Sequence, residues 1–180
     1  MTRYHATLLL ALLEQLDIVV EEVTEPSTHS QSPTAFELDL TSRIITAPSR
    51  WDGGRGAVHA GMDVSVEGLL HEAMHLLTHP PYASIEEVPE PWILFQVELA
   101  YAESLGPDVL LRVKVWQSEV IAANDPESPK FKDYWRQGYR IARKVGLLDA
   151  KDRPTYQWPD WTVLTLEERD SWQRVSPELE

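Results

Sequence analysis

The chain has 180 residues, of which 43% are hydrophobic, and a formal net charge of −13. This charge argues against a nucleic acid or an anionic membrane as partner, because phosphate groups repel an acidic surface. The sequence contains no cysteine, which excludes disulfides, thiolate zinc sites and thiol catalysis. Any metal would therefore be bound by imidazole and carboxylate groups.

The N-terminal part predicts one helix and a few short strands. Residues 3–16 have the pattern of an amphipathic helix, and their leucine run is too short to cross a membrane. No small-residue cleavage site follows the run, so we expect a cytoplasmic protein. The β-branched residues 17–23 predict a strand. Residues 35–40 alternate apolar and acidic side chains, and 43–47 have the pattern of a second short strand, so the two could form a hairpin.

The segment "GLLHEAMHLLTHPP" predicts a helix over about residues 66–78. Ser65 or Asp63 would cap its first turn, because a short polar side chain can accept a free backbone N–H there. The prolines at its end would stop it, since proline has no N–H and its ring clashes with the preceding turn. The rest of the chain predicts four more helices, at 92–106, 107–124, 128–150 and 164–172. The last of these begins with a capping box of Thr165 and Glu168.

Two histidines of the 66–78 helix have the spacing of a zinc site. His71 and His75 are four residues apart, so both imidazoles project from one helix face and can reach one Zn²⁺. Glu72 follows the first histidine and would act as general base on a zinc-bound water, whose pKa the metal lowers. The alternative interpretation is a surface helix that carries solvated histidines.

A catalytic zinc ion needs a third protein ligand. His79 is a poor candidate, because two helical turns place it about 12 Å from His71 along the axis. Glu98 is a better one, since it falls within the apolar stripe of the 92–106 helix, where an unpaired carboxylate is costly. Glu103 falls on the polar side of that helix. Further glutamates lie in the acidic loop between the two helices, namely Glu86, Glu87 and Glu90. Without a metal, Glu98 would instead form a buried ion pair.

The segments "HEAMHLLTHPP" and "FQVELAYAE" resemble the ImmA/IrrE family of small zinc peptidases, in the gluzincin class. The resemblance implies an α+β fold with a minimal zincin-like domain over residues 1–106. It leaves 107–180 as a mainly helical, tryptophan-rich extension packed on that domain. It also implies that an edge strand at 43–47 pairs with an extended peptide. Members of the family often cut a transcriptional repressor and are often carried by phages or mobile elements. The implied zinc ligands are His71, His75 and Glu98, with Glu72 as the base.

Peptide hydrolysis also needs a group that stabilises the oxyanion. Tyr101, one turn beyond Glu98, is the first candidate, and His59 and Tyr139 are the others. A basic stripe on the 128–150 helix indicates internal charge balance or a docking face; its members are Lys130, Lys132, Arg136, Arg140, Arg143 and Lys144. The tryptophans of the extension, at 135, 158, 161 and 172, are typical of residues that anchor a subdomain to a core.

The sequence thus predicts a zinc-dependent peptidase that acts on a protein or peptide, in which Glu72 activates the attacking water. The alternative is a catalytically silent binding or regulatory module, of phage or mobile-element origin, that keeps the metal. The presence of Glu72 favours the enzyme, because an inactive scaffold has no need of that carboxylate. The oligomeric state and the substrate are left open.

Overall fold

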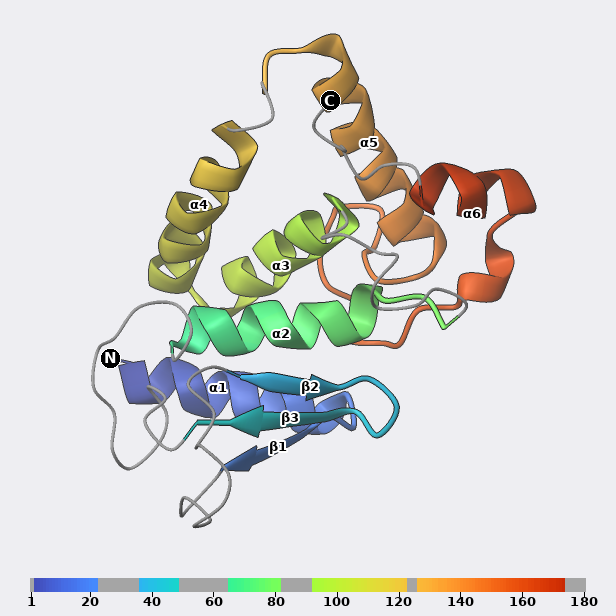
Figure 1. Cartoon of the computed structure of the whole chain (residues 1–180). Helices are drawn as coiled ribbons and strands as arrows, with labels where there is room; N and C mark the ends of the chain where they lie inside the picture. The colour runs from blue at the N-terminus through green and yellow to red at the C-terminus, as the bar shows by residue number, and fades with distance from the viewer. Residues whose placement is uncertain (1, 23–35, 49–64, 82–91, 123–125, 174–180) are drawn as a thin grey trace, which may run out of the picture.

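The computed structural model describes residues 2–22, 36–48, 65–81, 92–122 and 126–173 (Figure 1). These residues form an α+β fold of six α helices, one short 3-10 helix and a three-stranded sheet. Among them, no helix is long and apolar enough to cross a membrane. The α+β class expected from the sequence is therefore confirmed.

The sheet has the strand order β1-β3-β2. The first strand, β1 (Val19–Glu22), runs parallel to β3 (Ile44–Ala47), and β2 (Glu37–Asp39) pairs antiparallel with β3. The predicted hairpin is thus confirmed. The expectation that 43–47 is an edge strand is wrong, because β3 is hydrogen-bonded to a neighbour on both sides. The described edges of the sheet are β1 and β2.

The turn between β2 and β3 is stabilised by the Asp39 side chain. Its Oδ1 accepts the backbone N–H groups of Thr41 at 2.9 Å and of Ser42 at 3.2 Å. The Ser42 side chain, and next the backbone N–H groups of Ser42 and Thr41, lower the pKa of the Asp39 carboxyl by hydrogen bonding. Arg43 completes the turn in the left-handed region, with φ 58°. The local hydrogen bonds replace the glycine that tighter hairpins use.

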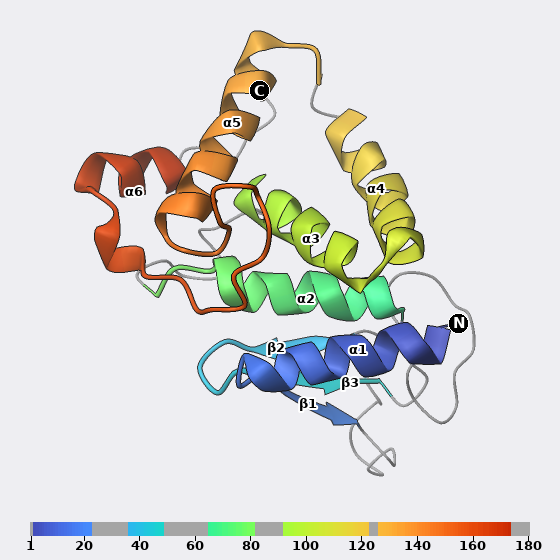
Figure 2. The ribbon, with the colours of Figure 1, turned by 180° about the vertical axis from the view of Figure 1, so that it is seen from behind.

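Two helices pack against the sheet and against each other. Helix α1 (Thr2–Gln15) lies in front of the strands in Figure 2, and α2 (Val66–Thr78) runs beside β2 in Figure 1. Leu9 and Leu13 of α1, Ile45 of β3 and Leu69 of α2 are fully buried at this junction. Removing such side chains from water supplies the main stabilisation, about 1.5–3 kcal/mol for each.

Helix α3 (Trp92–Leu105) contacts both neighbouring layers, since α2 packs on one side of it and α4 (Pro107–Ala122) and α5 (Pro129–Lys144) on others. The sequence correctly predicted all three as helices. The range predicted for α5, 128–150, extends too far at its C-terminal end. Helix α5 ends at Lys144 because Gly146 adopts φ 87°, which breaks the helical path.

The C-terminal region packs against the N-terminal helix and sheet. The indole N–H of Trp158 donates to the carbonyl of Leu16 at 2.7 Å, and the Arg43 guanidinium lies 3.9 Å above the centre of a Trp158 ring. Trp161, in the short helix η2 (Trp161–Val163), is buried. These two tryptophans have the anchoring role that the sequence predicted. The buried hydrophobic cluster includes residues on both sides of position 106.

The last helix, α6 (Leu166–Gln173), begins with the predicted capping box. The Glu168 N–H donates to Thr165 Oγ1 at 3.2 Å, and the Thr165 N–H donates to Glu168 Oε2 at 2.9 Å. Glu168 also accepts from Lys144 of α5, which ties the two helices together. This part of the basic stripe therefore serves internal charge balance, as do Lys132 with Glu127 and Arg143 with Asp152.

Candidate metal centre

Helix α2 has the bounds that the sequence predicted, and its cap explains where it starts. Ser65 Oγ accepts the N–H of Gly68 at 3.1 Å, which satisfies one free donor of the first turn. Leu69, Leu70 and Leu77 are fully buried and fix the rotation of the helix against the sheet and α3. This rotation turns one side of α2, with His71, toward α3 and α4.

The two histidines meet across one helical turn. His71 Nε2 lies 3.2 Å from His75 Nε2, and the two rings are nearly perpendicular at 85°. His71 is buried, at 6% exposure, whereas His75 and Glu72 are partly exposed. The i, i+4 spacing thus brings the two imidazole nitrogens together at a site that opens toward solvent on the side of His75.

Glu98 of α3 contacts the histidine pair through His71. Its side chain is fully buried, and its Oε1 lies 3.3 Å from Nδ1 of His71. When Glu98 is ionised it can only accept, and the hydrogen at this contact is then on the imidazole Nδ1. The lone pair of a neutral His71 is then on Nε2, which is the atom that faces His75.

Gln117 of α4 holds the other oxygen of Glu98. Its Nε2 donates to Glu98 Oε2 at 2.5 Å and to the Phe95 carbonyl at 3.2 Å, and the side chain is 1% exposed. Both partners are acceptors, so the amide nitrogen must face them. Gln117 was not among the site residues predicted from the sequence. The signal was present, because Gln117 continues the buried stripe of Val109 and Val113 at i+4 spacing, where a polar side chain needs a partner.

Trp116 also contacts the site and was missed. Its ring packs edge-to-face on His71 with 4.6 Å between centroids, and on Phe95 with 5.8 Å. The contact places an aromatic side chain of α4 directly against the His71 ring. Helix α4 therefore supplies two neighbouring side chains, one that packs on the imidazole and one that binds its carboxylate partner.

The imidazole pair fits the donor geometry of a transition-metal ion. Two Zn–N bonds of about 2.0–2.1 Å at a tetrahedral angle place their nitrogens about 3.3 Å apart, and the observed separation is 3.2 Å. Glu98 is not on that side of His71, because it contacts Nδ1. Within the described ranges, no three histidine, aspartate or glutamate side chains are grouped so as to hold one ion.

The remaining candidates occupy different environments. His79 is the C-cap of α2, and its backbone N–H donates to the carbonyl of His75 at 3.0 Å. Glu103 is exposed, as expected for a surface charge. Tyr139 on α5 is partly buried, and burial raises its pKa. The loop candidates lie outside the described residues; they are His59, Glu86, Glu87 and Glu90.

Tyr101 is fully buried on α3, and its ring packs edge-to-face on Tyr156 with 5.5 Å between centroids. Its hydroxyl has no hydrogen-bond partner among the described residues. Burial, and next the neighbouring Tyr156, raise the pKa of Tyr101 well above its usual range. A role in stabilising an oxyanion stays a prediction for this residue.

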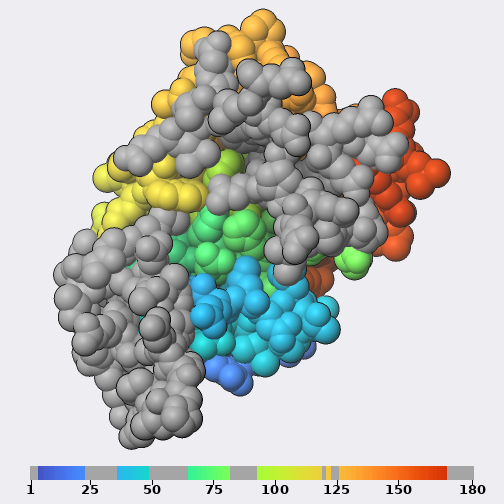
Figure 3. Space-filling model, in the orientation of Figure 1, coloured from blue at the N-terminus to red at the C-terminus, as the bar shows by residue number. Residues whose placement is uncertain are grey.

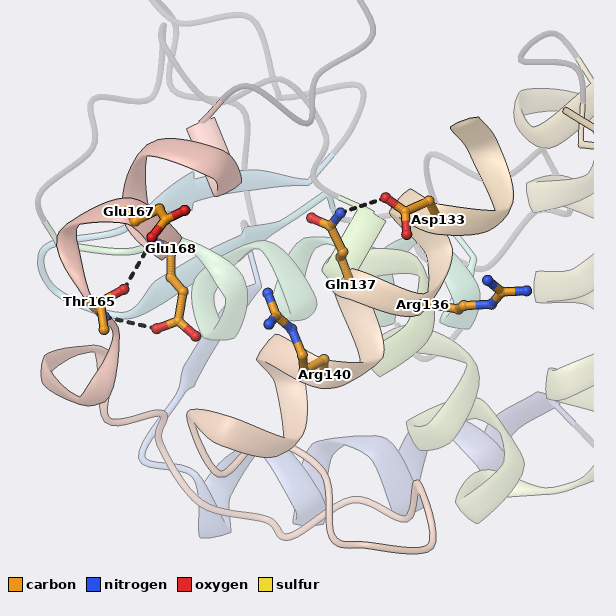
Figure 4. Close-up of a pocket in the computed structure, with 7 residues that line it drawn as sticks. All are labelled: Asp133, Arg136, Gln137, Arg140, Thr165, Glu167 and Glu168. Carbon is orange, nitrogen blue, oxygen red and sulfur yellow. Dashed lines mark hydrogen bonds between the residues drawn. The ribbon is translucent and has the colours of Figure 1, made fainter. Parts of the chain in front are cut away.

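A separate cleft of about 620 Å³ lies between α5 and the start of α6 (Figure 4). Charges of both signs line it, with Arg140 pointing into the space between the helices and Glu168 facing it from α6. His71, His75 and Glu98 are not among the residues that line it. The lining residues are Asp133, Arg136, Gln137, Arg140, Thr165, Glu167 and Glu168. Most of these side chains are exposed, so the cleft has no buried polar group to select a ligand.

Comparisons of the chain with models of protein families, with curated proteins and with solved structures give no match.

Proposed function

We propose that the protein is a zinc-dependent peptidase in which His71 and His75 bind the ion through Nε2. The observation that carries the proposal is the 3.2 Å separation of these two nitrogens on one face of α2. The proposal includes the zincin-like arrangement of α2 and the sheet, and with it the likeness to the ImmA/IrrE peptidases. Cysteine is absent from the sequence, so imidazole and carboxylate groups are the available metal ligands.

A bound zinc ion would supply a Lewis acid that polarises the peptide carbonyl and acidifies water. Glu72 is next to His71 in the chain and is partly exposed. It would remove a proton from the attacking water and return it to the amide nitrogen as the C–N bond breaks. The residue thus acts first as base and then as acid, and is unchanged after the cycle.

The described edge strand nearest α2 is β2, and we propose that an extended peptide pairs with it. Figure 3 shows the cyan atoms of β2 and β3 next to the green atoms of α2 on one face of the molecule. Glu37 and Asp39 of β2 are exposed. Their carboxylates favour a substrate with basic side chains, as does the net charge of −13.

The proposal is tested with the purified full chain in two steps. Elemental analysis after saturation with zinc and desalting should give about one ion per chain. The loaded protein is then incubated with a library of peptides rich in lysine and arginine, and cleavage is followed by mass spectrometry. Chelation should abolish cleavage and added zinc should restore it. Zinc binding without any cleavage would support the silent binding module, and failure to bind zinc would refute both.

A further inference from the structure

Glu98 was the third ligand suggested by the sequence, but its contacts fit a different task. Its Oε1 lies on Nδ1 of His71, 3.3 Å away, while the Nε2 of the same ring faces His75. The two ring nitrogens of an imidazole point in divergent directions. A carboxylate at Nδ1 therefore does not share the position that the two Nε2 atoms define.

The geometry points to Glu98 as a positioning residue that orients His71 and sets its tautomer, with Gln117 holding Glu98 in place. This inference rests on the proposed metal site. A carboxylate that accepts Nδ1–H leaves the Nε2 lone pair for a metal, and it makes the imidazole a better donor. The third protein ligand would then come from elsewhere in the chain.

Burial and packing explain why this arrangement is rigid. Glu98 is fully buried and Gln117 is 1% exposed, so water does not compete for their hydrogen bonds. The amide of Gln117 is itself fixed by its second bond to the Phe95 carbonyl. Trp116 packs on the His71 ring, so α4 contacts the imidazole directly as well as through Gln117 and Glu98. Helices α3 and α4 thereby fix the ring that α2 presents.

The first test uses cobalt(II) as probe, because its visible absorption bands report the ligand set. Glu98→Gln keeps an oxygen that can accept from Nδ1, so the affinity should fall by less than about tenfold; Glu98→Ala should lose about 10–100-fold, as is typical of an outer partner of a ligand. The band positions should stay unchanged in both variants. Shifted bands, or a larger loss in Glu98→Gln, would show that Glu98 binds the ion directly and would overturn the inference.

A matched pair of glutamines separates positioning from stability. Gln117→Met removes the donor to Glu98 and should weaken cobalt binding by about 3–10-fold, less than loss of the carboxylate itself. Gln96→Met is the control, since Gln96 is equally buried but donates to the Trp135 carbonyl. It should lower thermal stability without a change in cobalt affinity. Equal effects of the two variants on affinity would contradict a positioning role for Gln117.

A second readout does not depend on metal. Nitrogen-15 spectra of the histidines in the metal-free full chain should show His71 with its proton on Nδ1, and Glu98→Ala should lose this preference while Glu98→Gln retains it. His71→Ala serves as the control for the proposed function and should abolish cobalt binding. If His71→Ala binds cobalt like the parent, the metal site is refuted. If His71 in the parent carries no proton on Nδ1, the orienting role is refuted instead.

Discussion

The imidazole Nε2 atoms of His71 and His75 lie 3.2 Å apart across one turn of α2. At this distance the two nitrogens either share a proton in a hydrogen bond or bind one ion with both lone pairs. With Glu98 ionised, the hydrogen of His71 lies on Nδ1 toward Glu98, and the Nε2–H of His75 then donates to His71. A metal bound by both Nε2 lone pairs would displace this hydrogen from His75 Nε2.

His75→Ala is expected to lower zinc affinity by more than about 100-fold, because loss of a ligand costs more than the 10–100-fold loss of an outer partner. Competition against a chromophoric chelator measures the change. His79→Ala is the control, since His79 lies on the same helix end as its C-cap, outside the imidazole pair. Equal losses in the two variants would indicate nonspecific binding by histidines.

Glu72→Gln should reduce kcat for peptide cleavage by about 10²–10⁴-fold while zinc stays bound, because the amide keeps the size of the side chain but cannot take a proton. Metal content and steady-state kinetics are measured on the same preparation. Glu103→Gln, a change at an exposed carboxylate of α3, should leave kcat unaltered. Full activity in Glu72→Gln would exclude this residue as the base.

Gly138→Ala should destabilise the fold by about 1–3 kcal/mol through overpacking. A Cβ at position 138 would overlap Gln96 Oε1, and Gln96 is fully buried with its Nε2 bonded to the Trp135 carbonyl at 2.7 Å. Elsewhere in a helix the same substitution is favourable, since alanine is the better helix former. Urea unfolding measures the change, and a double variant with Gln96→Ala should recover part of the loss. A stabilised Gly138→Ala protein would show that the contact is not tight.

Glu168→Gln should remove a pH-dependent part of the stability. The hydrogen bond from Lys144, and next the backbone N–H of Thr165, lower the pKa of Glu168 from 4.5 to about 2. A carboxyl whose pKa is lower in the folded state stabilises the fold above the unfolded value of 4.5, and this contribution is lost as the pH falls from there to about 2. The Tm difference between parent and variant should therefore be constant at neutral pH and disappear near pH 2.

Glu167→Gln is the control for this pH series, because Glu167 is the exposed neighbour of Glu168 in the same turn. Its Tm difference from the parent should be small across the range. A difference for Glu168→Gln that persists at the acid end would mean that the capping box with Thr165, and not the charge, accounts for the effect.

Much of the local structure could be predicted because its causes are local. Ser65 and the 78–81 segment set the ends of α2, and the Thr165–Glu168 capping box starts α6, as the residue types imply. The predictions from the sequence were wrong where a contact between residues distant in the chain, or a particular backbone conformation, determined the structure. Nothing in the residues 43–47 shows that β1 adds to their free side and makes β3 the central strand.

The sequence by itself determined that two imidazoles stand one turn apart on a buried helix, because the pitch of an α helix relates i to i+4 whatever surrounds it. It also placed Glu98 on an apolar face, where a carboxylate needs a partner. Only the tertiary structure decided which partner. Glu98 and Gln117 are 19 residues apart, and Glu98 and His71 are 27 apart. Their hydrogen bonds exist because α4 packs on α3 and α3 on α2, and such packing depends on the shape of the whole core.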